Sequence, residues 1–253
     1  MIEIKNLITE YNGRTALEIE KLALEEGKIT AIVGLNGSGK STLLKSILGL
    51  NPFKGEILID GKSLHSLTVK KRASLVSYLP QSSPSAAMDI YTLVSHGRFP
   101  HLGFSKILGA KDITLVEKAL KLTDLWNIRY KGLAEISGGQ RQRAYLAMVI
   151  AQNTKYILLD EPATYMDIKH QIEIMSVLKE LVKEGRGIIF ASHDLPQSFT
   201  VSNNICLLKT GHLAACGKPE TLSLNYELMK SVMEIALAKD DDDGAVYSYK
   251  ILK

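Results

Sequence analysis

The chain of 253 residues has little cysteine, no long apolar run and no large excess of charge. Its longest uninterrupted apolar stretch, residues 144–151, is far shorter than the roughly 18 residues that a membrane-spanning helix needs. The N-terminus shows no basic segment followed by an apolar stretch, so no secretory signal is visible. These absences exclude a bilayer-spanning chain, and we expect an ordinary folded protein inside the cell.

The charge balance and the cysteines exclude two further classes of site. Lys and Arg number 31 against 27 Asp and Glu, an excess too small to demand a nucleic-acid partner. Cys206 and Cys216 flank Thr210-Gly211, which is typical of a two-residue hairpin loop. In such a hairpin Cys206 faces Ala215, and the two thiols point to opposite faces of the sheet. The sequence therefore predicts neither a disulfide nor a zinc site.

The pattern of apolar residues predicts an α/β protein with an inserted helical region. Short apolar runs separated by helical periodicity suit a buried parallel sheet with crossover helices. Strand signals stop between residues 81 and 151, where helical periodicity takes over. The acidic run at residues 240–243 indicates a polar turn rather than a calcium site. The expected strands cover residues 2–7, 16–24, 28–33, 56–59, 156–159 and 187–191.

A glycine-rich loop lies between the apolar run at residues 29–33 and a helical pattern at residues 43–48. The loop, Gly34-Leu35-Asn36-Gly37-Ser38-Gly39-Lys40-Ser41, matches G-x-x-x-x-G-K-[ST]. Backbone amides of such a loop converge on a phosphate, and a following helix adds its positive end. The Lys40 ammonium group could neutralise the β- and γ-phosphate oxygens of a nucleotide, and the Ser41 hydroxyl could bind Mg²⁺. The loop predicts a site for nucleotide phosphates.

Residues 156–161, Tyr-Ile-Leu-Leu-Asp-Glu, predict a buried strand that ends in two acids. Buried carboxylates are costly unless another charge balances them, and a metal ion would do so. Asp160 suits a Mg²⁺ contact, while Glu161 could polarise the water that attacks a γ-phosphate. Taken alone, the pattern fits equally well a strand end exposed to solvent. The pattern supports a metal site only because the same chain also carries the phosphate loop.

A second glycine-containing segment, Ser137-Gly138-Gly139-Gln140-Arg141-Gln142-Arg143, precedes the apolar run at residues 144–151. Ser137 suits a helix N-cap, and the two glycines leave the first helical amides open to an anion. A capped helix start needs no ligand at all, so this alternative stays open. Because the first phosphate site is already complete, the segment suggests a role toward a nucleotide held by another copy.

In their order and spacing these motifs resemble the ATPase subunit of ATP-binding cassette (ABC) transporters over nearly the whole chain. The resemblance implies a P-loop NTPase (RecA-like) core with an antiparallel β subdomain and an inserted α-helical subdomain. It divides the chain into three parts: residues 1–81 with the β subdomain and a loop like Walker A (Gly34–Thr42), residues 82–151 with a segment like the signature motif (Ser137–Gln140), and residues 152–253. The last part carries a strand end like Walker B (Ile157–Glu161), His193 in the place of the switch histidine, and the C-terminal segment.

The resemblance also implies a role for each motif residue, with ATP and Mg²⁺ as cofactors. Lys40, Glu161 and His193 would be catalytic, with Glu161 as general base and His193 at the γ-phosphate. Ser41, Gln81 and Asp160 would hold Mg²⁺. The residues that would bind ATP are Tyr11, stacked on adenine, and Asn36, Gly37, Ser38, Gly39, Lys40, Ser41, Thr42, Gln81, Ser137, Gly138, Gly139, Gln140 and Asp167.

The partners implied by the resemblance are a second copy and a membrane protein. In the head-to-tail homodimer, Walker A of one subunit and the signature of the other enclose ATP. The subunit would lie on the cytoplasmic face of the cell membrane, peripheral, beneath an integral-membrane permease, with a substrate-binding protein as an indirect partner. The segments Gly97–Gly103 and Asp167–Gln171 look like those of importers of iron-siderophores, haem and cobalamin.

Three residues depart mildly from the family pattern. Ala163 stands where Thr commonly follows Glu-Pro. Met166 stands where Leu usually precedes the aspartate that corresponds to Asp167. Ile136 stands where Leu commonly precedes the signature serine, here Ser137. A soluble ABC ATPase of iron-sulfur cluster assembly is the alternative to an importer subunit. A regulatory subunit that does not hydrolyse ATP is disfavoured, because the chain carries the catalytic residues named above.

Overall fold

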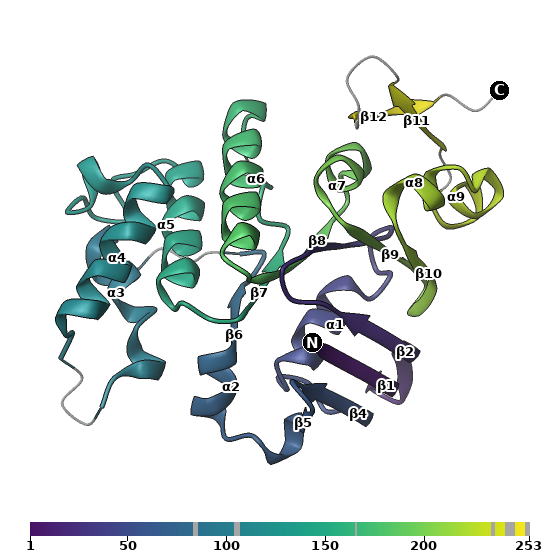
Figure 1. The fold of residues 1–253 in the computed structure, drawn as a ribbon, viewed down its shortest axis with the longest axis horizontal. Helices are drawn as coiled ribbons and strands as arrows, with labels where there is room; N and C mark the ends of the chain where they lie inside the picture. The colour runs from purple at the N-terminus through teal and green to yellow at the C-terminus, as the bar shows by residue number, and fades with distance from the viewer. Residues whose placement is uncertain (83–85, 104–106, 165, 234–235, 241–245, 251–253) are drawn as a thin grey trace. The chain divides into compact units, whose positions relative to one another are not determined.

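The computed structural model describes the whole chain except residues 83–85, 104–106, 165, 234–235, 241–245 and 251–253. The described residues form two compact units, which we treat separately (Figure 1). The first unit comprises Met1–Leu67 with Gly187–Lys253, and the second comprises Thr68–Arg186. Both units combine strands with helices, which confirms the α/β class. The limits of the three predicted segments stay a prediction.

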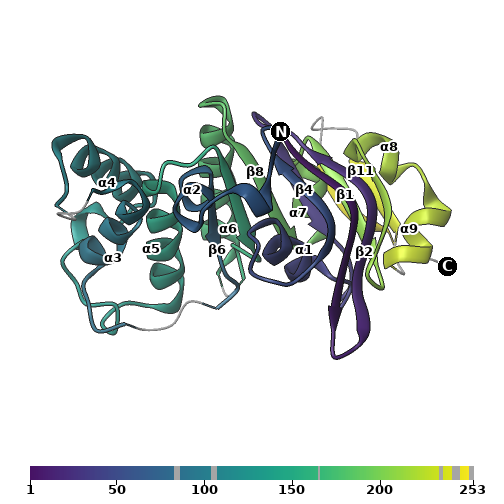
Figure 2. The same cartoon turned by 90° about the horizontal axis from the view of Figure 1, so that it is seen from below.

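The sheet of the first unit has an antiparallel and a parallel part, in the order β5-β4-β1-β2-β10-β9-β3-β8. The long β1–β2 hairpin of the antiparallel part is seen in Figure 2. In the parallel part, β3 pairs with both β8 and β9. The strands are β1 (Ile2–Tyr11), β2 (Arg14–Leu24), β3 (Ile29–Val33), β4 (Lys54–Ile59), β5 (Lys62–Ser63), β8 (Gly187–Ser192), β9 (Asn204–Lys209) and β10 (His212–Gly217).

The two parts of this sheet differ in burial, as their sequences predict. In β2, Leu17 and Ile19 are buried while Glu18 and Glu20 are exposed, which is the alternation of a strand with one solvated face. Every residue of β3 is buried, as is every residue of β8. A strand buried on both faces needs a nearly continuous apolar run, and residues 29–33 supply four apolar residues and Thr30.

Helices and a small hairpin complete the first unit. In α1 (Lys40–Ile47), Leu43, Leu44 and Ile47 form the buried face that the periodicity predicts. The last strand packs on α7, where the Phe199 and Tyr247 rings lie 5.4 Å apart. The acidic turn predicted at residues 240–243 falls largely on residues outside the described part of the chain. The other elements are η1 (Leu64–Ser66), α7 (Leu195–Val201), α8 (Pro219–Ser223), α9 (Tyr226–Met233), β11 (Ala236–Asp240) and β12 (Val246–Lys250).

The second unit has one parallel strand pair and a group of packed helices. Strands β6 (Val76–Leu79) and β7 (Tyr156–Asp160) pair in parallel. Helices α3, α4 and α5 pack on one another (Figure 2). Between residues 81 and 151 the described residues form no strand, as predicted. The helices are α2 (Val69–Leu75), α3 (Ile90–His96), η2 (Phe99–His101), α4 (Ala110–Leu122), η3 (Trp126–Ile128), α5 (Gly138–Ala151) and α6 (Ile168–Lys183). No helix in the described ranges is both long and apolar enough to span a membrane.

A buried arginine closes the C-terminal end of α5. Arg98 is 4% exposed, and its guanidinium donates to the main-chain oxygens of Ala151 and Gln152 at 2.8 and 2.9 Å. Its Nε donates to the Asp112 carboxylate at 2.9 Å. A cation at this end of a helix satisfies carbonyls that have no donor within the helix and is favoured by the helix dipole. Asp112 in turn balances the buried charge.

The β9–β10 hairpin overturns the expected placement of the cysteines. Its two-residue loop at residues 210–211 has positive φ at both positions, which confirms the predicted turn. The strand register then shifts between Leu213 and Ala215, so Cys206 lies opposite Cys216. The prediction that Cys206 faces Ala215 is wrong, because a β-bulge adds one residue to β10. The two sulfur atoms lie 2.9 Å apart on the same face, and both cysteines are free.

We expect Asp112→Asn to destabilise the second unit. The hydrogen bond from Arg98 lowers the pKa of Asp112 below its usual range, although partial burial opposes this shift. A carboxylate with a lowered pKa in the folded state stabilises the fold above its unfolded pKa, and this contribution is lost as pH falls through the folded pKa. At neutral pH the free energy of unfolding should fall by about 1 to 2 kcal/mol.

Urea unfolding at neutral pH and at pH values below the usual carboxyl range measures this effect. The control is Glu117→Gln on the same helix, because Glu117 forms only an exposed pair with Lys121, at 3.9 Å. Its stability should match that of the unsubstituted protein. A stability difference for Asp112→Asn that stays constant down to low pH would contradict the prediction.

Candidate functional site

The predicted phosphate loop joins the end of β3 to the start of α1. Gly37 and Gly39 adopt φ values of 78° and 103°, a region that favours glycine. Lys40 is 6% exposed, and its Nζ donates to the Gly34 and Leu35 oxygens at 2.8 and 3.1 Å. The loop thus curls around a buried ammonium group. Such a group can exchange carbonyl partners for the oxygens of a bound phosphate.

The β9–β10 hairpin supports this loop from within the same unit. Gly211 N donates to the Ser38 oxygen at 3.1 Å, and a Cβ at Gly34 would lie 2.4 Å from the Leu208 oxygen. Ser38 is 4% exposed, and its Oγ is buried with no hydrogen-bond partner among the described residues. A cavity of about 280 Å³ lies beside the loop, lined in part by Asn36, Gly37 and Ser38.

His193 and the phosphate loop leave the sheet at the same edge. Val33 is the last residue of β3, and it pairs in parallel register with Ser192, the last residue of β8. His193 and Gly34 therefore follow at equivalent positions on adjacent strands. The structure thus brings the predicted switch histidine to the edge that carries the phosphate loop.

The other predicted residues of the first unit lie at the ends of its elements. Tyr11 ends β1 and is 43% exposed, next to a tight turn at residues 12–13 with positive φ values. Its ring is accessible for stacking. Ser41 and Thr42 belong to the first turn of α1 and are half-buried.

The acid pair closes β7 in the second unit. Leu79 pairs with Leu159, so Gln81 and Asp160 leave β6 and β7 at one edge. Asp160 is 2% exposed, and its Oδ2 accepts a hydrogen bond from the Tyr78 hydroxyl at 3.3 Å. Burial and, next, the Asp160 charge raise the pKa of Tyr78. Tyr78 therefore stays protonated and acts as a donor to Asp160.

Glu161 is held by two side chains in a strained conformation. Its φ is 52°, in the left-handed region that residues other than glycine seldom adopt. Its Oε2 accepts hydrogen bonds from Gln81 Nε2 at 3.1 Å and from Thr164 Oγ1 at 3.0 Å. Such strain persists only where the surroundings enforce it, and it is frequent at functional sites.

The signature segment forms the N-terminus of α5. Ser137 Oγ accepts from Gln140 N at 3.2 Å, and Gln140 Oε1 accepts from Ser137 N at 3.0 Å. This reciprocal pair is a capping box, which satisfies two amides at the helix start. A Cβ at Gly138 or Gly139 would meet nothing within 4 Å, so both glycines face open space. The predicted N-cap role of Ser137 is confirmed.

Asp167 has a similar role at the start of α6. Its Oδ1 accepts from the His170 amide at 2.9 Å and contacts His170 Nδ1 at 2.7 Å. The backbone hydrogen bond is the largest cause that lowers the pKa of Asp167. The residue is exposed at the start of α6.

Within each unit the structure groups part of the predicted set. The first unit holds the phosphate loop and His193 at one edge, and the second holds Gln81, Asp160 and Glu161 at another. The signature segment and Asp167 lie at two other helix starts of the second unit. Tyr78 and Thr164, the hydrogen-bond partners of the two acids, are not among the predicted site residues. Tyr78 could have been found by aligning the two parallel strands, whereas Thr164 depends on the fold of the loop after β7.

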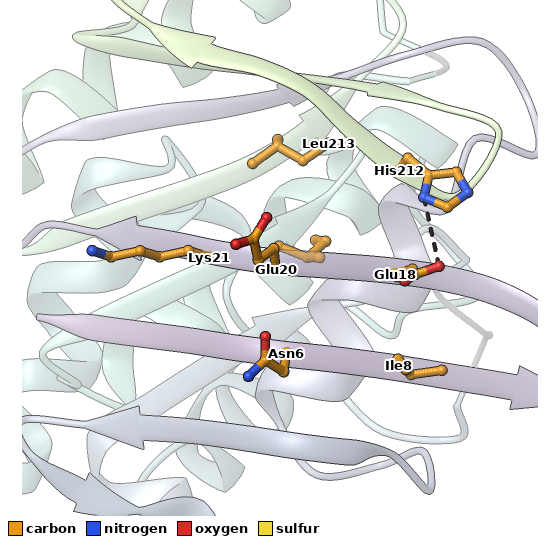
Figure 3. Close-up of a pocket in the computed structure, with 8 residues that line it drawn as sticks. Asn6, Ile8, Glu18, Glu20, Lys21, His212 and Leu213 are labelled. Atoms are coloured by element: carbon orange, nitrogen blue, oxygen red, sulfur yellow. Dashed lines mark ion pairs between the residues drawn. The ribbon is translucent and has the colours of Figure 1, made fainter.

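A separate cavity of about 730 Å³ lies on the antiparallel part of the first unit's sheet (Figure 3). Strands β2 and β10 pair at one position only, between Glu18 and His212, whose Oε2 and Nδ1 atoms lie 3.9 Å apart. Asn6, Ile8 and Lys21 also line the cavity. None of the residues predicted to bind nucleotide or metal belongs to it.

The strand–glycine loop–helix unit, the Ser38 hydroxyl without a partner among the described residues, and the acid pair with its buried Asp160 define a P-loop nucleotide-binding protein. Residues 17–164 match the family model described as ABC transporter. The chain therefore belongs to the ABC transporter family, and it is an ATPase subunit of that family.

Relatives and solved structures agree with this assignment. The petrobactin import ATP-binding protein YclP of Bacillus subtilis (strain 168) is 40% identical over 225 residues, 88% of each chain. The iron(3+)-hydroxamate import ATP-binding protein FhuC of the same strain is 36% identical over 229 residues, 89% of this chain and 84% of that protein. A dimeric ATP-binding cassette in a post-hydrolysis state with ADP and Pi matches with a TM-score of 0.78 at 27% identity, over 87% and 99% of the two chains.

We expect Gly34→Ala to weaken ATP binding by about a hundredfold, because a displaced loop loses amide hydrogen bonds to the charged phosphates, each of which contributes about 1.5 to 3 kcal/mol. The added Cβ would lie 2.4 Å from both the Leu208 oxygen and Ser38 Oγ, so the loop must move. Titration with a fluorescent ATP analogue measures the affinity. Gly217→Ala is the control, because its Cβ would make only ordinary contacts, at 3.8 and 3.9 Å, with Leu222. Equal affinities for the two variants would rule the prediction out.

Proposed function

We propose that this chain is the ATP-hydrolysing subunit of an importer that takes up an iron-siderophore, haem or cobalamin-type metal complex through a partner permease. The observation that carries the catalytic part is the Glu161 carboxylate, oriented by Gln81 and Thr164 directly beside the buried Asp160. The importer part is supported by the relatives, whose names refer to import of petrobactin and iron(3+)-hydroxamate. The cargo itself does not contact this chain.

ATP would bind with its phosphates on the loop between β3 and α1. The amides of residues 36–42 would surround the β-phosphate, and Lys40 would exchange its two carbonyl partners for β- and γ-oxygens. The Ser38 hydroxyl, which is buried and has no partner among the described residues, would gain an acceptor. Tyr11 would stack on the adenine, because its ring is exposed at the end of β1.

The oxygen-rich residues present fit Mg²⁺. Ser41, Gln81 and Asp160 would hold it, with phosphate oxygens and water completing the shell, as Mg²⁺ prefers few protein ligands. The described residues contain no group of three or more His, Cys, Asp and Glu that could hold a metal, which suits an ion that needs a bound phosphate. When bound, Mg²⁺ would neutralise charge that develops on the phosphates.

Glu161 would accept a proton from the attacking water, and His193 would contact the γ-phosphate. In the present structure the amide nitrogen of Gln81 donates to Glu161 Oε2, whereas Mg²⁺ would take the amide oxygen of Gln81. Gln81 could therefore serve both groups. Thr164 donates to the same carboxylate oxygen and so helps to orient Glu161.

The signature segment would act on ATP bound by a second copy. Ser137, Gly138, Gly139 and Gln140 begin α5, where main-chain amides and the helix dipole favour an anion. The two glycines face open space, so a phosphate could approach them closely. Asp167 would contact the same interface. A homodimer would thereby enclose ATP, and it would dock peripherally on a permease at the cytoplasmic face, with a substrate-binding protein as an indirect partner.

The segment Gly97–Gly103 has a structural explanation as well as a family one. A Cβ at Gly97 would lie 2.2 Å from the Met148 oxygen, so only glycine fits there, and Arg98 closes α5. These contacts position the helix that carries the signature segment. The choice of importer over a soluble assembly ATPase therefore depends more on the relatives than on this segment.

We expect Tyr78→Phe to raise the Mg²⁺ concentration that half-saturates ATP hydrolysis by about tenfold, because hydrogen-bonding partners of metal ligands typically contribute that much to metal affinity. The rate at saturating Mg²⁺ should change little. The measurement is ATPase activity across a Mg²⁺ titration. Tyr130→Phe is the matched control, because Tyr130 is 69% exposed and lies outside the predicted site. An unchanged Mg²⁺ dependence in a stably folded Tyr78→Phe protein would show that Tyr78 does not position Asp160.

We expect Glu161→Gln to lower the ATPase rate by at least about a hundredfold and to trap an ATP-bound dimer, because the general base is lost while the ATP-binding groups remain. Light scattering with and without ATP measures the dimer. The double variant Lys40→Ala, Glu161→Gln should stay monomeric, because it cannot hold the triphosphate. Wild-type turnover in Glu161→Gln would overturn the catalytic assignment.

The same Glu161→Gln protein, tagged and loaded with ATP, tests the importer part by co-purification from detergent-solubilised membranes. We expect a polytopic permease, encoded together with a metal-chelate binding protein. Recovery of soluble iron-sulfur assembly partners alone would overturn the importer and leave the ATPase assignment standing.

A further inference from the structure

The two cysteines of the first unit form a close cross-strand pair. Cys206 lies on β9 and Cys216 on β10, and the two residues face each other in antiparallel register. Their sulfur atoms are 2.9 Å apart. Cys206 is fully buried, whereas Cys216 is exposed. One thiol of the pair is therefore open to solvent-borne reagents, and the other is protected behind it.

The hairpin geometry suits a bond between these thiols. Facing residues of an antiparallel pair have Cα atoms about 4.5 or 5.5 Å apart, and disulfides span about 4.4 to 6.8 Å. A disulfide requires the sulfur atoms to approach to about 2.05 Å, so the required movement is under about 1 Å. Side-chain rotation can supply that movement without separating the strands.

The contact also divides the roles of the two sulfur atoms. The hydrogen bond between the two sulfur atoms lowers the pKa of Cys216, and the same bond together with burial raises the pKa of Cys206. The thiolate is the reactive form of cysteine. Cys216 is thus the exposed nucleophile, and Cys206 is the adjacent thiol that can resolve an oxidised intermediate.

We propose that Cys216 and Cys206 are an oxidant-modification site that forms a reversible intrachain disulfide with a small peroxide. The Cys216 thiolate attacks one peroxide oxygen, the O–O bond breaks, and hydroxide leaves with the electron pair to become water after protonation. The Cys206 sulfur then attacks the sulfur of the Cys216 sulfenic acid. The S–O bond breaks, and the departing hydroxide takes the Cys206 proton to form a second water. The two thiols are oxidised by two electrons, and the peroxide is reduced.

The cysteine pair lies in the β9–β10 hairpin, which contacts the phosphate loop. Cys206 pairs with Ile32 of β3, two residues before the loop begins. The Leu208 oxygen approaches Gly34, and Gly211 N donates to Ser38. A disulfide would join both strands of the hairpin that makes these contacts. The proposal itself rests on the thiol geometry and does not depend on the proposed import function.

The test treats the reduced, folded chain with stoichiometric hydrogen peroxide and measures its intact mass and free thiols. We expect a protein lighter by two hydrogen atoms, with no free thiol and with one cross-linked peptide pair containing Cys206 and Cys216. Reduction with dithiothreitol should restore both thiols.

Two variants distinguish the proposed roles. Cys216→Ser should leave Cys206 reduced, because the remaining thiol is buried. Cys206→Ala should allow Cys216 to gain oxygen without losing hydrogen, because the resolving thiol is absent. Wild-type protein that keeps both thiols, or in which Cys216 gains oxygen while Cys206 stays free, would overturn the proposal.

Thermal unfolding gives a second readout on the wild-type chain alone. Closing a loop of this length in the unfolded chain should raise the unfolding temperature of the oxidised form by about 5 °C. A mass loss of two hydrogens together with a lower unfolding temperature would indicate a cross-link that the native hairpin does not accommodate. That result would contradict the proposed site.

Discussion

Within each unit, buried parallel strands that end together are the constraint on which the rest of the unit depends. β3 pairs with β8 and β9, and β6 pairs with β7, all in parallel register. Because β3, β7 and β8 are buried along their whole length, their charged residues can lie only at the last strand position or beyond it. The phosphate loop follows β3, His193 follows β8, and the acid pair closes β7. Each unit thereby gathers reactive groups at the carboxyl ends of its strands, where open α/β sheets bind ligands.

Several motif residues also stabilise the helices that carry them. Ser137 and Gln140 close the start of α5 by a capping box, and Asp167 caps α6. At the other end of α5, the Arg98 guanidinium donates hydrogen bonds to the main-chain oxygens of Ala151 and Gln152. A residue of this kind has two physical reasons to be present, and only one of them concerns a ligand. Each helix start nevertheless keeps amides and a positive dipole end beside its capping residue, so capping and anion binding are compatible.

The local part of the fold could be predicted, because its causes are local. The largely apolar run at residues 29–33, the phosphate loop and the amphipathic α1 follow from residue type and period. The same holds for the Thr210-Gly211 turn, since both residues adopt positive φ. The contacts of Tyr78 with Asp160 and of Thr164 with Glu161 could not be predicted, because they depend on strand register and on the path of the chain after β7.

The sequence alone determined the class of the protein, the phosphate loop and the order of its motifs, because these depend on residue types at fixed short spacings. The tertiary structure decided which side chains meet. A single extra residue in β10 brought Cys206 and Cys216 together, against the expectation from an unbroken hairpin. The left-handed backbone at Glu161 turned its carboxylate toward Gln81, which lies 80 residues earlier in the chain. Such contacts follow from register and chain path, which no local pattern encodes.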